Sequence, residues 1–175
     1  MSTTTVLRDP TAEAAPVRRA RRTPPWSLDD ITVALMDIGK MRGDEFIDRL
    51  EQLFEERGVA TKRWKKPTNT RTAPVEMLQE IAEEADVVVV ALSDCGSCTS
   101  CSTHDLNDLD ARGVPGVSVL TEEFRSAFAG QCETIGFDGA SIFVPHPVQN
   151  RTTDQLYAMA ENVIEDVICA ITRRK

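Results

Sequence analysis

The sequence predicts an α/β fold with three layers, in which parallel strands form the middle layer. Short apolar runs rich in branched residues alternate with longer segments whose apolar residues recur at helical spacing. The run at residues 87–92 is apolar at every position, as expected for a central strand buried on both faces. Strands that alternate with helices pair in parallel through right-handed crossovers. The economical arrangement is a single domain with a five-stranded parallel, flavodoxin-like sheet.

The first half of this domain contains two units of strand and helix. We expect the first strand at residues 31–36, followed by a helix whose apolar positions recur over 46–54 and which ends near Gly58. Residues 59–64 suit an edge strand because two of their side chains are charged. The second helix has its apolar stripe over 78–82.

The second half begins with the central strand at 87–92, and the helix after it runs to about residue 112. Further strands are expected at 117–120 and 140–144, with a short helix over 121–129 between them. The last helix has the clearest apolar stripe, from Leu156 to Ile171. Thr152 and Gln155 precede that stripe with the spacing of a capping box, which marks where the helix begins.

Residues 1–29 are predicted to be an arm outside the domain, which then covers residues 30–175. The arm shows no hydrophobic periodicity and contains four prolines and five arginines, four of them between residues 18 and 22. It is expected to be flexible or loosely docked. In an acidic protein, such a basic segment could also pack on a partner subunit or on a second copy of the chain.

Composition and charge narrow the class of protein. The chain has 175 residues and a net charge of -8, which argues against a nucleic-acid binder because phosphate contacts need a basic surface. Its longest apolar run is too short to cross a membrane, and no signal segment opens the chain. We therefore expect a cytoplasmic protein. In that compartment, five cysteines indicate catalysis, redox chemistry or metal binding rather than a disulfide framework.

Three cysteines and a histidine follow the central strand at intervals of three residues: Cys95, Cys98, Cys101 and His104. Cys95 and Cys98 form a CxxC pair at a strand-to-helix junction. A helix N-terminus stabilises a thiolate, so Cys95 is the candidate nucleophile and Cys98 the thiol that resolves the intermediate. Either histidine of the chain, His104 or His146, could move protons in this scheme.

Metal binding is the alternative use of the same four side chains. Three sulfurs and one imidazole suit zinc or an iron–sulfur cluster. This needs the segment from Cys95 to Cys101 to be a loop, with the helix beginning only at Ser102. If the helix begins earlier, Cys95 and His104 are badly placed for a shared ion. The sequence is compatible with both starts, and no cofactor is predicted for the redox interpretation.

Other polar side chains are expected at the same edge of the sheet, because the carboxyl ends of parallel strands meet there and form ligand sites. They are the candidate substrate-binding residues Asp37 and Lys40 after the first strand, Ser97 and Thr99 in the cysteine segment, and Thr121 and Glu122 after the fourth strand, together with His146 after the fifth. A cleft of this kind would bind a small anionic substrate.

Several other polar side chains have simpler expected roles. The three aspartates of the third helix, Asp105, Asp108 and Asp110, are expected to form a solvated face. Cys132 is expected in a loop, and Cys169 beside the apolar stripe of the last helix.

The motif Asp94-Cys95-Gly96-Ser97-Cys98 resembles that of the UGSC family, named for selenocysteine-Gly-Ser-Cys. The likeness extends over most of the chain and includes the segments 6–11, 37–40, 112–115, 120–124 and 144–147. The resemblance implies that Cys95 occupies the selenocysteine position and is the attacking atom. Cys101 departs from the family, which often has an aromatic residue there. A more remote likeness is to the selenoprotein subunits of amino-acid reductases.

These observations predict a thiol-dependent oxidoreductase, or the catalytic subunit of one, that acts on a small anionic substrate or on the disulfide of a redox partner protein. Two other classes stay open. One is a cofactor-independent acid/base enzyme of the racemase type, which would need a second cysteine from another half-domain. The other is a non-enzymatic module that binds zinc or an iron–sulfur cluster.

Overall fold

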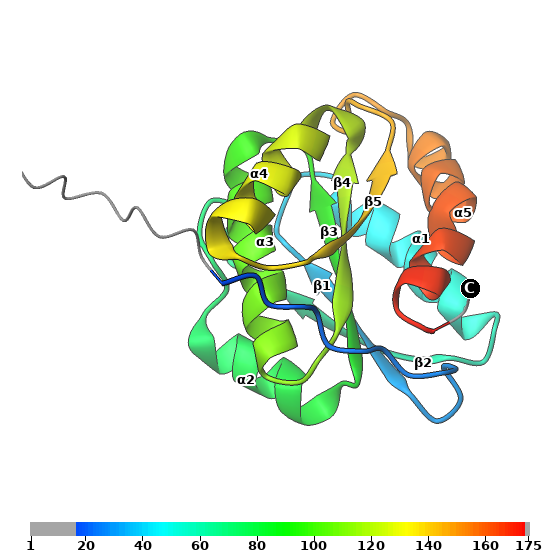
Figure 1. Cartoon of the computed structure of the whole chain (residues 1–175). Coiled ribbons are helices and arrows are strands. Elements are labelled where there is room, and N and C mark those ends of the chain that lie inside the picture. The colour runs from blue at the N-terminus through cyan, green and yellow to red at the C-terminus, as the bar shows by residue number, and fades with distance from the viewer. Residues whose placement is uncertain (1–16, 174–175) are drawn as a thin grey trace, which may run out of the picture.

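The computed structural model describes residues 17–173 and confirms the predicted fold class. Five parallel strands form one sheet in the order β2-β1-β3-β4-β5, with helices on both faces (Figure 1). The strands are β1 Thr32–Asp37, β2 Ala60–Lys65, β3 Val87–Ser93, β4 Gly116–Thr121 and β5 Ala140–Val144. Each boundary lies within one residue of its prediction. Short apolar runs rich in branched residues therefore located the strands well.

The helices are α1 Gly43–Glu55, α2 Val75–Glu84, α3 Gly96–Ala111, α4 Arg125–Ile135 and α5 Thr153–Ala170, with a 3-10 turn η1 at Glu122–Phe124. The prediction of a short helix over 121–129 was wrong in its extent. The 3-10 turn comes first, and α4 continues until Gly136, whose φ of 69° ends the helix in the left-handed conformation. Cys132 consequently lies on α4 and not in a loop.

The two faces of the sheet are covered by different helices. α1 and α5 cover one face, while α2, α3 and α4 cover the other (Figure 1). Successive residues of a strand point to opposite faces, so Val33 and Leu35 pack toward α1 and α5 while Ala34 and Met36 pack toward the other layer. All seven residues of β3 are buried. This two-sided burial explains why the run at 87–92 shows no polar alternation.

An irregularity near the end of β3 sets the direction of the residues that follow. Val90 pairs with Ser118 and Ser93 pairs with Leu120, so β3 uses three residues where β4 uses two. Beyond this bulge the Ser93 hydroxyl lies 2.8 Å from that of Ser102 on α3. The bulge and this contact together fix the junction between β3 and α3 against α3.

Part of the predicted N-terminal arm, residues 17–29, lies along the domain. Arg19 forms a parallel bridge with Phe137 just before β5 and an ion pair with Asp110 on α3. Arg173 donates to the carbonyl of Pro24 at the other end of this segment. Residues 1–16, the remainder of the arm, lie outside the described residues.

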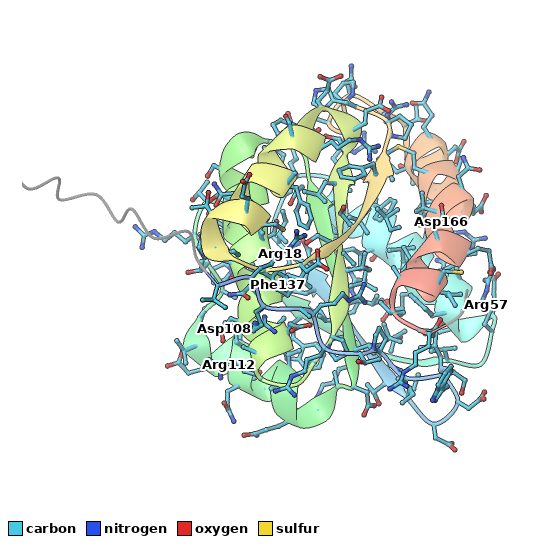
Figure 2. The ribbon with its side chains drawn as sticks, viewed as in Figure 1. Arg18, Arg57, Asp108, Arg112, Phe137 and Asp166 are labelled. Carbon is cyan, nitrogen blue, oxygen red and sulfur yellow. The ribbon has the colours of Figure 1, made fainter. Side chains whose placement is uncertain are left out.

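The aspartates of α3 do not form a solvated face, which corrects the sequence prediction. Asp105 and Asp110 are buried, and only Asp108 is substantially exposed, where it pairs with Arg112 at 2.8 Å (Figure 2). The partners of the two buried carboxylates, Lys66 and Arg19, come from distant segments. Local periodicity carries no information on such pairings.

Candidate active site at the carboxyl edge of the sheet

The carboxyl ends of β1, β3, β4 and β5 bring Asp37, Cys95, Thr121 and His146 to one edge of the sheet. The edge includes the point where the strand order reverses, because β1 has β2 on one side and β3 on the other. In open α/β sheets, ligands bind at such a switch point. The sequence expectation that polar groups meet here therefore agrees with the topology.

Cys95 is the N-cap of α3, in extended conformation with φ at -159°. Its sulfur accepts a hydrogen bond from the backbone N–H of Cys98 at 3.4 Å. The side chain of Cys98 accepts from the N–H of Cys95 at 3.0 Å, so the two cysteines form a reciprocal capping box. α3 therefore begins at the CxxC pair and not at Ser102.

The two free thiols differ in exposure. Cys95 is half-buried, whereas Cys98 is fully buried against the α2–α3–α4 layer. The two sulfurs lie 2.8 Å apart, with the Cys95 thiol donating to Cys98, and the Cys98 thiol donates to the backbone carbonyl of Cys95 at 3.1 Å. Burial raises the pKa of Cys98 to about 11, and the hydrogen bond to Cys95 adds to that shift. Cys98 therefore keeps its proton at neutral pH, while the more accessible sulfur is Cys95.

A carboxylate next to Cys95 organises the strand ends around it. Asp94 accepts a hydrogen bond from the hydroxyl of Thr121 at 3.0 Å and lies 2.7 Å from the Nδ1 of His146. Its other oxygen accepts from the backbone N–H of Val148 at 3.3 Å. Three segments of the chain, which follow or end β3, β4 and β5, therefore meet at the buried side chain of Asp94.

His146 is held from several sides and stays partly open to solvent. Its Nδ1 faces Asp94 and the Thr121 hydroxyl, which is 3.1 Å away. The ring of Phe124 packs edge-on against the imidazole, with the centroids 5.9 Å apart. The carbonyl of His146 accepts from Arg151 in the following loop. With Nδ1 occupied in this way, Nε2 is the nitrogen left for proton exchange.

The predicted substrate-binding residues separate into two groups. Lys40 is half-buried and forms no ion pair within residues 17–173, and Ser97 and Glu122 are exposed, so these three are available to a ligand. Thr99 is fully buried and donates to the carbonyl of Cys95.

Thr121 and Asp37 are also committed to the protein. Thr121 is buried in the Asp94 network, and Asp37 accepts from the N–H of Gly39 at 2.7 Å and pairs with Lys65 at 3.2 Å. Together with Thr99 they position the site, because their polar atoms already have protein partners.

His104 lies away from Cys95, contrary to the expectation that both histidines reach this edge. It is exposed in the third turn of α3 and borders a hollow between α2 and α3. Nine helical residues rise about 13.5 Å, so no shared ion or direct proton transfer is possible between the two. Within residues 17–173 no three His, Cys, Asp or Glu side chains converge as metal ligands. The alternative metal set Cys95, Cys98, Cys101 and His104 is therefore not brought together.

Asp94 is the residue of the candidate site that the sequence analysis did not single out. It appears there only within the family motif, although it directly follows a fully buried strand and precedes the candidate nucleophile. An acidic residue at that position is a usable signal, because a carboxylate costs too much to bury unless it has partners. Those partners, Thr121 and His146, were themselves identified in the sequence.

Three comparisons place the chain among known proteins. The sequence model of the UGSC family matches residues 6–173. Among solved structures, the chain is similar to a diflavin flavoprotein from Nostoc sp., at 13% identity and a TM-score of 0.45 over 82% of this chain and 94% of that one. It is also similar to the flavodoxin-like domain of a Synechococcus sp. protein, at 16% identity and a TM-score of 0.47 over 82% and 99%. No curated protein matches.

No helix within the described residues is both long enough and apolar enough to cross a membrane.

Proposed function

This chain belongs to the UGSC family, and we propose that it is a thiol-dependent oxidoreductase or the catalytic subunit of one. The observation that carries the proposal is the pairing of Cys95 and Cys98. Their sulfurs are 2.8 Å apart, one is half-exposed and the other is buried. A pair with this asymmetry can attack from one sulfur and close a disulfide with the other.

In the first step, the thiolate of Cys95 attacks one sulfur of a substrate disulfide. A mixed disulfide forms, the substrate's S–S bond breaks and one substrate thiolate leaves. In the second step, Cys98 loses its proton and attacks the sulfur of Cys95, which releases the other half of the substrate as a thiol. The substrate gains two electrons and two protons, and the Cys95–Cys98 dithiol is oxidised to a disulfide. An external dithiol must then restore the pair.

The arrangement of proton donors supports this sequence of steps. The backbone N–H of Cys98, in the first turn of α3, donates to the sulfur of Cys95 at 3.4 Å, which favours negative charge on the attacking sulfur. The positive end of the helix dipole acts in the same direction. His146, with Nδ1 held by Asp94, is the candidate donor of a proton to the leaving thiolate through Nε2.

A small anionic substrate suits this edge. Lys40 has no ion-pair partner within residues 17–173, and the exposed Ser97 adds a hydroxyl beside the thiols. A negatively charged disulfide would be attracted by the lysine and by the positive end of α3.

Oxidation by oxidised glutathione, a small anionic disulfide, tests the proposal. We expect the full chain to lose two thiols and form one disulfide between Cys95 and Cys98, seen by peptide mass spectrometry. Cys95→Ser should prevent that disulfide, while Cys101→Ser, the matched control one turn further along α3, should leave it unchanged. A chain in which Cys95 and Cys98 stay reduced would contradict the proposal.

The contact between Asp94 and His146 favours a second candidate. A cysteine, a histidine and an aspartate can also serve a single-nucleophile reaction, in which Cys95 forms a covalent acyl intermediate and Cys98 has no chemical role. Cys98→Ser separates the two functions. It should block disulfide formation under the first and leave turnover intact under the second.

A further inference from the structure

A groove of about 650 Å³ lies between α4 and the edge strand β5, and neither Cys95 nor Cys98 lines it. One stripe of α4 forms one wall and residues 136–143 form the other. Arg18 and Phe137, which are labelled below α4 in Figure 2, both line this groove. Its volume falls within the usual range for small-molecule sites.

The walls of the groove are aromatic. Phe128 from α4 and Phe137 and Phe143 from the opposite wall all line it. A Cβ at Gly139 would come within 3.0 Å of the Phe137 ring and 3.1 Å of the Phe128 ring. The absence of a side chain at Gly139 therefore leaves room between these rings. Flat apolar groups pack well in such a space, offset-stacked or edge-on against the phenylalanines.

One end of the groove carries a cation that is available to a ligand. The guanidinium of Arg125 lies over the ring of Phe143, 3.8 Å from its centroid. It forms no ion pair or side-chain hydrogen bond with any residue of 17–173, unlike Arg18, which pairs with Asp138 at 2.6 Å. A guanidinium that stacks on an aromatic face keeps its N–H edge free for bidentate contact with a carboxylate.

The two acidic residues in the groove, Glu133 and Asp138, do not oppose an anion at Arg125, and Asp138 is paired with Arg18. Glu133 lies eight residues further along α4, which is about 12 Å along the helix axis. The groove is therefore polarised, with its free positive charge at the Arg125 end. An anionic ligand has one favourable orientation in it.

An unpaired polar group lies on the strand next to the groove, although it does not itself line the groove. Ser141 lines the groove and is in register with Ser118 on β4. Residues in register on parallel strands face the same side of the sheet. The Ser118 hydroxyl is fully buried and has no hydrogen-bond partner within the described chain. Unpaired buried hydroxyls are uncommon and often belong to sites that a ligand or water completes.

We propose that this groove binds a small aromatic carboxylate, with its ring between the three phenylalanines and its carboxylate on Arg125. The site is independent of the dithiol chemistry. Arg125 would select for negative charge, and the apolar space between the phenylalanines would select for a flat ring. Small-molecule sites commonly combine a few polar contacts with an apolar pocket in this way.

Protein-observed NMR titration of the full chain tests the proposal, with 3-phenylpropionate and its neutral amide as probes. We expect the acid to bind at least about tenfold more tightly than the amide, since a charge-assisted pair is the only contact that distinguishes them. Arg125→Gln should remove that preference and leave the amide unchanged. Arg71→Gln, at an exposed arginine outside the groove, is the matched control and should retain the preference.

Two further measurements locate the ligand. Ala129→Phe, at an exposed position of the groove wall on α4, should abolish binding of both probes without unfolding the chain. Bound acid should slow alkylation of Cys132, which lines the groove, but not of the exposed Cys169 on α5. Equal affinity for acid and amide would overturn the proposal. So would a Cys132 already shielded by residues 1–16 or by a second copy, with no added protection by the acid.

Discussion

The first and third turns of α3 carry ionisable side chains in opposite surroundings. At the first turn, Cys95 is half-exposed beside the polar network of Asp94 and His146. At the third turn, Asp105 pairs with Lys66 at 2.6 Å, and both side chains are at most 1% exposed. The first turn of the helix therefore exposes a thiol to solvent, whereas the third turn buries an ion pair.

Helix geometry explains why even spacing does not produce a single site. A step of three residues falls short of the 3.6-residue turn, so each successive side chain rotates back by about 60° and rises by about 4.5 Å. Over the nine residues from Cys95 to His104 this amounts to about half a circle. Residues that look like one cluster in the sequence therefore spread around α3, and only the first two, Cys95 and Cys98, stay in contact.

Breaking the third-turn ion pair should have the largest effect on stability. Asp105→Leu leaves the ammonium of Lys66 buried without a partner, and we expect the free energy of unfolding to fall by about 3–5 kcal/mol. Urea denaturation measures the change. Asp108→Asn, at the exposed aspartate one turn along, is the control and should cost less than about 1 kcal/mol. Replacing both partners, as Lys66→Met with Asp105→Leu, should recover much of the loss. A small effect of Asp105→Leu alone on the free energy of unfolding would contradict the contrast between the first and third turns of α3.

Thiol reactivity should separate the two cysteines of the first turn by about a hundredfold or more. A thiol with its pKa at about 11 is ionised in only about one chain in ten thousand at pH 7. Iodoacetamide labelling with peptide mass spectrometry should therefore modify Cys95 long before Cys98. The rate at Cys98 should rise about tenfold per pH unit until its pKa is reached. Faster labelling of Cys98 at neutral pH would reverse the assigned roles.

The same buried thiol should make stability depend on pH at the alkaline end. The folded state raises the pKa of Cys98 to about 11, so it holds the proton more tightly than the unfolded chain does. Stability is therefore unaffected below the unfolded value near 9 and is lost as the pH rises from there toward 11, by up to about 2 kcal/mol. Denaturation at several pH values should show the decline, and Cys98→Ser should flatten it. An equal slope in the variant would assign the decline to other groups.

Replacing the carboxylate of Asp94, beside Cys95, should change the rate at which the thiol pair is oxidised more than it changes the stability of the pair. Asp94→Asn weakens the hold on Nδ1 of His146, so we expect oxidation by glutathione disulfide to slow about tenfold. His146→Gln should cost a similar factor, and the double variant little more, because Asp94 acts through His146. Additive losses would instead mean that the two residues act separately.

The smallest effects are expected further along α3. His104→Gln and Cys101→Ser should change the oxidation rate by less than about twofold, because neither residue contacts the Cys95–Cys98 pair. Elemental analysis of the purified chain and of both variants completes the test. Zinc or iron that is present in the unaltered chain and lost from either variant would restore the metal interpretation.

The fold was largely predictable from the sequence, because burial on two faces leaves a direct signature in strand composition. The runs at 87–92 and 140–144 and the capping box of Thr152 and Gln155 all appear in the structure as expected. The extent of α4 was not predictable in the same way. The helix was predicted to end at residue 129, whereas it stops at Gly136, where the backbone has a positive φ.

The site was predictable only where chain topology decides it. The positions of Cys95, Thr121 and His146 follow from strand order, since each lies at the carboxyl end of a strand or within two residues of it. Contacts made across the fold carry no local signal. The burial of Asp105 depends on Lys66, which lies 39 residues earlier in the chain. The commitment of Thr99 to a backbone carbonyl likewise depends on where α3 begins.

Trapping of the reaction intermediate tests the central assignment most directly. When the Cys98→Ser chain is treated with oxidised glutathione, the account predicts one glutathionyl group that accumulates on Cys95, because no second thiol remains to displace it. The reciprocal variant, Cys95→Ser, should carry no adduct at Cys98. An adduct on Cys98 in the second variant, or an unmodified Cys95 in the first, would contradict the account.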